Sequence, residues 1–212
     1  MAHSILYEAT PRRQADAAAE HLRATSAAHA ELSTASLPAV LEAASLLLTA
    51  FSSGQKLLIC GNGGSAADCQ HIAAELVGSL TRRRRPALPA IALTTDTSIL
   101  TGYANDYGYE EVFARQVDAY GSDGDVLLAI STSGSSVNVL RAVDAATARG
   151  LYTVALVGAA EGPLADRVDV RIRIPSTNTQ IIQECMLAVE HILCEVVEDA
   201  LFSQTGMQRW RP

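Results

Sequence analysis

The order of apolar and polar segments along the chain predicts strands and helices in alternation. Short apolar runs with the length and composition of buried strands occur at residues 56–60, 90–93, 125–130, 152–157 and 170–174. Longer stretches with a helical pattern follow at residues 65–80, 137–149 and 179–202. Apolar strands separated by helices are typical of a parallel sheet covered on both faces. The pattern therefore predicts an α/β fold with a doubly wound, five-stranded parallel sheet.

Two further helices are expected before the first strand. Residues 12–34 contain no glycine or proline, and residues 37–53 are more apolar and end before Gly54, which suits a helix terminus. The length of the chain favours a single domain. We expect this domain to comprise a helical arm at 1–53, an α/β core at 54–202 and a tail at 203–212.

Charge and composition then narrow the class of protein. The chain has 212 residues, a formal net charge of −7 and a pI of about 5.2, so nothing global attracts nucleic acid or an anionic membrane. No stretch reaches the roughly 20 apolar residues that span a bilayer, and no signal peptide is recognisable. The four cysteines form no C-x-x-C pair, which favours reduced thiols. We therefore expect a cytoplasmic protein that binds neither nucleic acid nor membrane.

A glycine-rich turn, Gly61-Asn62-Gly63-Gly64-Ser65, follows the first predicted strand. Its glycines let backbone N–H groups approach an anionic ligand at the start of the next helix. The turn is neither a Walker A sequence nor a G-x-G-x-x-G fingerprint with a ribose-binding acid, so nucleoside triphosphate and NAD are disfavoured as ligands. A tight turn that only requires glycine explains the sequence about equally well.

A second unusual turn, Ser131-Thr132-Ser133-Gly134-Ser135-Ser136, follows the third predicted strand. Ligands of doubly wound sheets bind beyond the carboxyl ends of the strands, where both turns are expected. Hydroxyl donors at a helix N-terminus can hold a phosphate without any lysine or arginine. Capping of the helix is the alternative, but a cap needs only one such residue. The second turn therefore favours phosphate binding.

A run of arginines, Arg82–Arg85, lies in the loop after the first core helix. A solvated loop is the favoured interpretation of such a charge run. Weak long-range attraction of an anionic substrate is the alternative.

Two helices carry residues that suit a metal ion. His71 and Glu75 are four residues apart and lie on one helix face, and imidazole nitrogen and carboxylate oxygen are zinc ligands. The last helix carries Gln183, Glu184, Glu190 and His191 within a mostly apolar sequence. Gln183 and His191 are separated by about 12 Å along the axis and about 80° around it, so they would approach one ion from different ends. A simple His/Glu hydrogen bond and a polar stripe that faces water remain the alternatives.

Four longer strings match a known family in order and spacing. They are CGNGGSAADCQHIAAEL, ANDYGYEEVFARQV, GDVLLAISTSGSSVNVLRAV and IPSTNTQIIQE, with His191 eight residues after Gln183. Over about residues 35–202 the chain resembles the phosphoheptose isomerase (D-sedoheptulose 7-phosphate isomerase) family of the sugar isomerase (SIS) fold group.

This resemblance implies an SIS-type sheet, a homotetramer with active sites at subunit interfaces, and one zinc ion per subunit. It implies conversion of D-sedoheptulose 7-phosphate to D-glycero-D-manno-heptose 7-phosphate through an enediol, for bacterial heptose and surface polysaccharide biosynthesis. By matching position, the metal ligands are His71, Glu75, Gln183 and His191, with Glu75 and His191 as the catalytic acid–base pair. The implied substrate-binding residues are Asn62, Gly63, Gly64, Ser65, Asn105, Asp106, Ser131, Thr132, Ser133, Ser136 and Gln183.

Three positions depart from the pattern of many relatives, namely Asn178, Ile181 and Met186. Two other functions also stay open. One is a non-catalytic SIS protein of the DiaA type, which binds the replication initiator, and the complete ligand set argues against it. The other is an SIS isomerase or etherase for a six-carbon amino sugar phosphate, and the length of the match argues against that.

Overall fold

The computed structural model describes residues 11–203 with the exception of 83 and 161, so the predicted tail lies outside it apart from Ser203. The strands are β1 (Leu57–Gly61), β2 (Ala90–Ala92), β3 (Val126–Ser131), β4 (Tyr152–Val157) and β5 (Val170–Arg173). The α-helices are α1 (Pro11–Ala35), α2 (Leu37–Ser52), α3 (Gly64–Val77), α4 (Thr97–Tyr107), α5 (Val112–Tyr120), α6 (Val137–Ala148) and α7 (Thr179–Phe202). Two short 3-10 helices are η1 (Tyr109–Glu111) and η2 (Pro163–Asp166).

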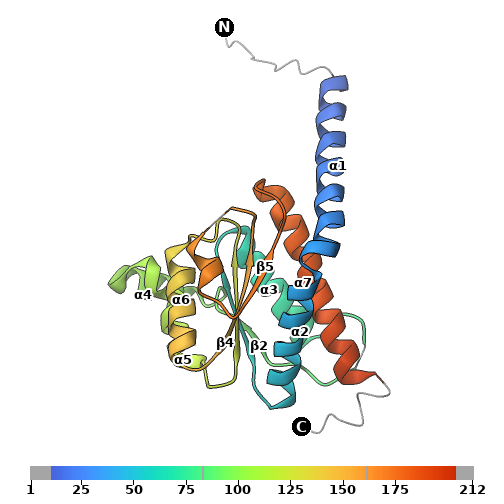
Figure 1. Ribbon diagram of the computed structural model, residues 1–212. Helices are drawn as coiled ribbons and strands as arrows, with labels where there is room; N and C mark the ends of the chain where they lie inside the picture. The colour runs from blue at the N-terminus through green and yellow to red at the C-terminus, as the bar shows by residue number, and fades with distance from the viewer. Residues whose placement is uncertain (1–10, 83, 161, 204–212) are drawn as a thin grey trace.

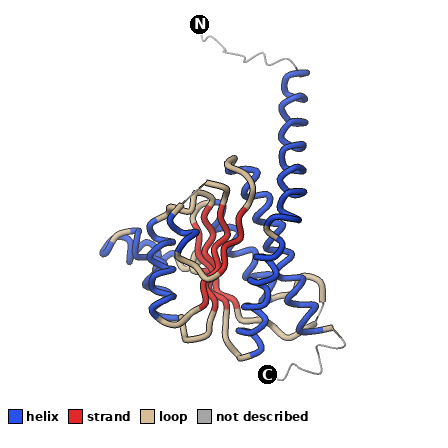
Figure 2. Tube along the Cα trace, in the orientation of Figure 1, coloured by secondary structure: helices blue, strands red, loops and turns tan. Residues whose placement is uncertain are grey.

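The strands form one parallel sheet in the order β2-β1-β3-β4-β5, with helices on both sides (Figures 1 and 2). Successive residues of a strand point to opposite faces, and β1 shows the consequence. Leu57 and Ile59 pack into a core with α2, α3 and α7, whereas Leu58 and Cys60 pack into a second core with α5 and α6. Apolar side chains are therefore needed on both faces, which explains the continuous apolar runs. The predicted fold class is confirmed.

The strand order places β1 and β3 side by side in the interior of the sheet. From β1 the chain crosses to β2 on one side and then returns to β3 on the other, so the topology switches direction between β1 and β3. Their register pairs Gly61 with Ile130, and β3 ends one residue later at Ser131. The glycine-rich turn and the hydroxyl-rich turn therefore emerge side by side, where doubly wound sheets bind ligands.

The sequence analysis did not identify the helices between β2 and β3. No residue of α4 is fully buried, and its apolar stripe is short and only half-buried, with Leu100 and Ala104 packed against the second core. α5 has only 9 residues, too few for a helical period to stand out, although Phe113 and Val117 are buried on it. The other predicted elements end within three residues of their predicted bounds.

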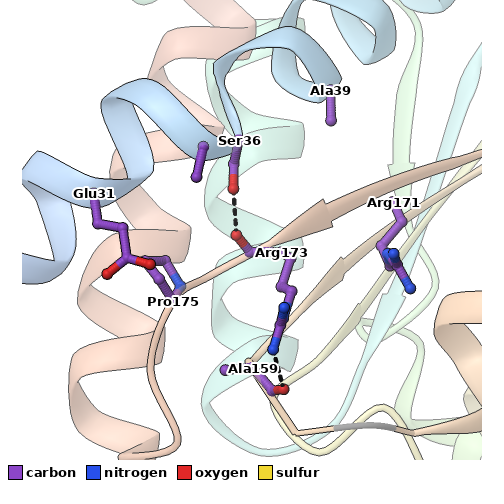
Figure 3. Close-up of a pocket in the computed structure, with 8 residues that line it drawn as sticks. Glu31, Ser36, Ala39, Ala159, Arg171, Arg173 and Pro175 are labelled. Atoms are coloured by element: carbon purple, nitrogen blue, oxygen red, sulfur yellow. Dashed lines mark hydrogen bonds between the residues drawn. The ribbon is translucent and has the colours of Figure 1, made fainter.

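A bend between α1 and α2 sets the direction of the N-terminal arm. α1 projects away from the sheet and meets α2 at 66° (Figure 1). At the bend, the Ser36 hydroxyl donates to the Arg173 carbonyl of the outer strand β5 at 2.6 Å, and the Arg173 guanidinium donates to the Ala159 carbonyl at 2.8 Å (Figure 3). The bend is therefore fixed to the free edge of the sheet.

The described helices differ from membrane-spanning helices in length and composition. None of them alone is long and apolar enough to cross a bilayer. Only α1 and α2 taken together reach that length and composition, and they are sharply bent. The apolar face of α2, including Leu47 and Phe51, is buried against the sheet.

The arginine run lies in a loop, as the sequence predicts, but the prediction that it is solvated is wrong at Arg85. Arg84 is exposed, but the side chain of Arg85 is only 2% exposed and pairs with Glu198, whose side chain is 0% exposed. A buried charge is tolerated when a partner and further hydrogen bonds satisfy it. That partner lies 113 residues away along the chain, so the local charge pattern contained no sign of it.

Candidate active site

The turn after β3 keeps its hydroxyl groups together. The Ser131 hydroxyl lies 3.3 Å from that of Ser136 and accepts from the Gly134 amide at 3.2 Å. Ser135 donates its amide and its hydroxyl to the Ser133 hydroxyl at 3.3 and 3.0 Å. Ser136 occupies the N-cap of α6, yet its side chain makes no capping hydrogen bond. Helix capping therefore does not account for these hydroxyls, and their arrangement at a helix N-terminus can bind a phosphate.

The turn after β1 requires its glycines at two positions. Gly63 has a φ of +58° and caps α3 without a side chain. A Cβ on Gly64 would lie 2.2 Å from the Gln183 amide nitrogen, so only glycine lets the Gln183 side chain lie here. Ser65 is 3% exposed, which places this predicted substrate contact inside the protein. The turn therefore brings Gln183 of α7, a predicted site residue, next to the first backbone amides of α3.

Two asparagines link the turns into one unit. The side-chain amides of Asn62 and Asn138 donate to each other's carbonyl oxygens, both at 2.8 Å. Tyr109 in η1 also donates its hydroxyl to the Asn62 side chain at 3.2 Å. Sequence analysis missed Asn138 and Tyr109. Asn138 lies in the first turn of the helix that follows the hydroxyl-rich turn, and this position was the only feature of the sequence that pointed to it.

A second group of predicted site residues meets where α3 and α7 pack together. The Nε2 atoms of His71 and His191 are 2.8 Å apart, and their rings meet edge to face. His71 Nε2 also lies 3.8 Å from a Glu75 carboxylate oxygen. All three side chains are partly exposed. The structure therefore joins residues that are 120 positions apart in the chain and that the sequence analysis predicted to act together.

The donor atoms of this His71–Glu75–His191 cluster suit zinc. Two imidazoles in contact through Nε2 cannot both carry a proton there, so at least one presents a lone pair. No trio of His, Cys, Asp or Glu among the described residues already surrounds one ion position. Two nitrogens on one tetrahedral zinc ion lie about 3.4 Å apart, so the rings would separate by roughly half an ångström to bind it.

Within one chain the predicted residues form separate groups. Gln183 lies against the glycine-rich turn, whereas His71 follows Gly64 by seven residues, about 10 Å further along α3. Asn105 donates to the Asp106 carboxylate at 2.8 Å, and both lie on exposed α4. Figure 1 shows α4 and α7 on opposite sides of the sheet. The turns and the histidine cluster are thus separate groups in a single subunit, and no hydrogen bond among the described residues joins the Asn105–Asp106 pair to either of them.

Two carboxylates near the histidine cluster have oxygens that are buried without hydrogen-bond partners among the described residues. Glu190 is 0% exposed, and neither of its oxygens has a hydrogen-bond partner in the described structure; the same holds for one oxygen of Asp68. Burial, and then the negative charge of Asp68, raise the pKa of Glu190 to about 9. The alternative that the polar residues of α7 face water is therefore wrong at Glu190. This carboxyl group is neutral at pH 7.

We expect Glu190→Gln to flatten the pH dependence of stability. Because the folded-state pKa lies above the unfolded value of 4.5, folding binds a proton between about pH 4.5 and 9. The free energy of unfolding therefore falls as pH rises, by up to about 1.4 kcal/mol per pH unit. The variant should match the wild type at pH 4.5 and exceed its unfolding free energy by about 3 kcal/mol at pH 7 in urea titrations.

The exposed residue Glu195 offers the matched control, and Glu195→Gln should follow the wild-type curve at every pH. Parallel curves for Glu190→Gln and the wild type would show that Glu190 is ionised in the folded protein.

Of two cavities lined by described residues, one includes a predicted site residue and the other does not. Gln183 lines a cavity of about 510 Å³ together with His21, Gln180 and Glu184. A cavity of about 370 Å³ lies at the α1–α2 bend, where Arg171 and Arg173 line it (Figure 3). The latter contains none of the predicted site residues.

The three departures from the family pattern have local structural roles. Met186 and Ile181 are 0% and 7% exposed and belong to the core. Asn178 is the N-cap of α7, and its side chain accepts from the Gln180 amide at 3.0 Å. None of the three belongs to the histidine cluster or to the two turns.

The parallel sheet with two ligand-type turns at its switch point defines the class of protein. The model of the SIS domain family matches residues 20–158, so the chain is an SIS-domain protein. It is 55% identical over 167 residues to a phosphoheptose isomerase of Roseiflexus sp. (strain RS-1), covering 79% of this chain and 84% of that relative.

Solved structures agree with this comparison. Phosphoheptose isomerase GmhA from Neisseria gonorrhoeae is 41% identical with a TM-score of 0.83, covering 88% of this chain and 99% of that one. A phosphoheptose isomerase from Francisella tularensis is 36% identical with a TM-score of 0.85, covering 88% of this chain and 98% of that one. The chain belongs to the phosphoheptose isomerase family, as its sequence motifs predicted.

Proposed function

We propose that this protein isomerises D-sedoheptulose 7-phosphate to D-glycero-D-manno-heptose 7-phosphate. Beyond family membership, the proposal rests on one contact. His71 on α3 lies against Glu75 on the same helix and against His191 on α7. The reaction needs one base for a carbon-bound proton and one group that moves a proton between oxygens. A carboxylate beside two imidazoles supplies both.

The proton movements assign a role to each residue. Glu75 takes the proton from C1 of the ketose, which leaves an enediolate over C1 and C2, and returns it to C2 to form the aldose. His191 donates a proton to O2 as the carbonyl there is reduced to a hydroxyl, and accepts the proton that leaves O1 as the new carbonyl forms. The turn at residues 131–136 holds the 7-phosphate.

Zinc is the metal we propose for the His71–Glu75–His191 cluster, one ion per subunit, with Gln183 as a fourth ligand. Glu75 and His191 move protons only while they are released from the ion, because an atom bound to the metal has no lone pair left to accept a proton. When bound, zinc supplies a Lewis acid that polarises the substrate carbonyl. The donor types and the lone pair held between the two histidines support this assignment. Gln183 is the least supported ligand, because its side chain lies against Gly64.

A homotetramer with interfacial active sites accounts for the separation of the groups within one chain. α1 projects away from the sheet, and α4 buries none of its residues in the subunit. Both helices are therefore available to another subunit, and Asn105 and Asp106 would complete a neighbour's site rather than their own. We place the enzyme in the cytoplasm, serving bacterial heptose and surface polysaccharide biosynthesis.

The experiment is a turnover assay of the zinc-loaded protein on a panel of sugar phosphates, followed by NMR. We expect an aldoheptose 7-phosphate from sedoheptulose 7-phosphate and little turnover of six-carbon amino sugar phosphates. Turnover of only an amino sugar phosphate would reassign the substrate. Binding to the replication initiator without any isomerisation would instead favour the DiaA-type alternative.

Gly64→Ala is expected to raise KM for sedoheptulose 7-phosphate several-fold with little change in the unfolding midpoint. The new Cβ would displace the amide end of Gln183, which is flexible enough to turn away from the substrate at small cost in stability. Gly102→Ala is the matched control, because nothing lies within 4 Å of its added Cβ. An unchanged KM in Gly64→Ala, measured by initial rates, would remove Gln183 from the substrate site.

A further inference from the structure

We propose that Arg85 is a positioning residue for the reaction, fixing the last turn of α3, which carries Glu75, to α7, which carries His191. This inference rests on the proposed function, because it concerns the same cluster. It assigns a role to Arg85, whose side chain is buried although Arg82 and Arg84 in the same run are not, a role that the charge pattern did not predict.

Glu198 on α7 is the fixed point of this arrangement. Its carboxylate accepts from the Leu80 amide at 2.8 Å, the Thr81 amide at 3.0 Å, the Thr81 hydroxyl at 2.8 Å and the Arg82 amide at 3.1 Å. Arg85 Nε adds a fifth donor at 2.7 Å. Burial alone would raise the pKa of Glu198, but the hydrogen bonds from Leu80, Thr81 and Arg85 lower it to about 2. A fully hydrogen-bonded carboxylate therefore holds the loop after α3 against α7.

Arg85 extends this contact from the loop to α3 itself. Its Nη2 donates to the backbone carbonyl of Glu75 at 2.8 Å, and its Nη1 donates to the Pro86 carbonyl at 2.8 Å. The last carbonyls of a helix lack partners within the helix, and the Glu75 carbonyl is among them because α3 ends at Val77. The planar fork of arginine is what allows one side chain to bind Glu198 and this carbonyl at once.

The geometry of α7 explains why this contact controls the active site. Glu198 follows His191 by seven residues, almost two full turns, so both lie on the same face about 10 Å apart along the axis. That face meets α3 twice: His191 contacts His71 at 2.8 Å, and Glu198 reaches Glu75 through Arg85. Sliding or rotation of α3 along α7 would break both contacts together. The Glu198–Arg85 bridge thus sets where the Glu75 side chain lies relative to the two histidines.

The same loop provides a matched control. Arg82 pairs with Asp199, one residue after Glu198, but these side chains are 39% and 69% exposed. An exposed ion pair contributes little to stability, and this one makes no contact with Glu75. Arg82→Gln therefore removes the same charge from the same loop without touching the bridge.

The test compares Arg85→Gln, Arg85→Lys and Arg82→Gln in the full-length, zinc-loaded protein. We expect Arg85→Gln to lower kcat ten- to a hundredfold with KM within about threefold, because displacement of a catalytic group by about an ångström costs that much. Arg85→Lys should keep the charge beside Glu198 and recover stability, but not the full kcat, because it lacks the fork. Arg82→Gln should behave as the wild type. Where Arg85→Gln does not fold, Arg85→Lys decides by its kcat.

The imidazole NMR signals of His71 and His191 give a readout that needs no substrate. They should shift in the Arg85 variants and not in Arg82→Gln. If the wild type fails to isomerise sedoheptulose 7-phosphate, the proposed function fails, and these signals alone decide the positioning role. Wild-type kcat and unshifted imidazole signals in folded Arg85→Gln, or equal losses in Arg82→Gln, would overturn the inference.

Discussion

Glu75→Gln is expected to lower kcat for sedoheptulose 7-phosphate by at least about a thousandfold while the protein stays folded. Glutamine keeps the size of the side chain and a carbonyl oxygen, but it cannot take the proton from C1. Glu75 is only partly buried, and its backbone contact with Arg85 does not depend on the side chain. The loss should therefore appear in kcat, with a wild-type circular dichroism spectrum and unfolding midpoint.

Glu195→Gln on α7 serves as the control for this result, because Glu195 is exposed and is not among the predicted site residues. It should leave kcat unchanged. A Glu75→Gln protein with near wild-type kcat would exclude Glu75 as the base and would leave the assignment of both acid–base residues without support.

Removal of the metal is expected to reduce turnover by at least about a hundredfold, and stoichiometric zinc should restore it. His191→Ala should weaken zinc binding by a similar factor, because it removes one of the two nitrogens that face each other at 2.8 Å. The measurement is zinc affinity by competition with a chromophoric chelator, alongside initial rates before and after chelation.

His21→Ala is the matched histidine variant for this experiment. His21 contacts Glu184 at 2.8 Å, outside the His71–Glu75–His191 cluster, so its loss should not change zinc affinity. Full turnover in the presence of excess chelator, with no zinc retained, would contradict a metal role for the cluster. Equal loss of zinc affinity in both variants would place the ion elsewhere.

The sheet and its switch point could be predicted from sequence because they depend on local patterns. Five apolar runs and the two turns that follow β1 and β3 are visible in the chain, and their positions follow from the rules of parallel sheets. α4 was missed because its apolar stripe is short and only half-buried. Leu100 and Ala104 pack against the core, but no residue of the helix is fully buried.

The residues of the candidate site could be predicted from the sequence, but the residues that hold them in place could not. The family motifs identified His71 and His191, and the structure brings them together. The partners of Arg85 and of Asn62 are set by tertiary packing between distant segments, so neither Glu198 nor Asn138 could be assigned from spacing alone. The buried state of Glu190 was hidden for a similar reason, because its helix is apolar on more than one side.

The central claim is that the histidine cluster acts on the sugar whose phosphate is held by the hydroxyl-rich turn. A crystal structure of the zinc-loaded protein with sedoheptulose 7-phosphate tests it most directly. We expect the phosphate against residues 131–136 of one subunit, and C1 and C2 beside Glu75 and His191 of the same or a neighbouring subunit. A phosphate bound away from that turn, or a sugar whose C1 lies far from every Glu75 in the assembly, would contradict the account.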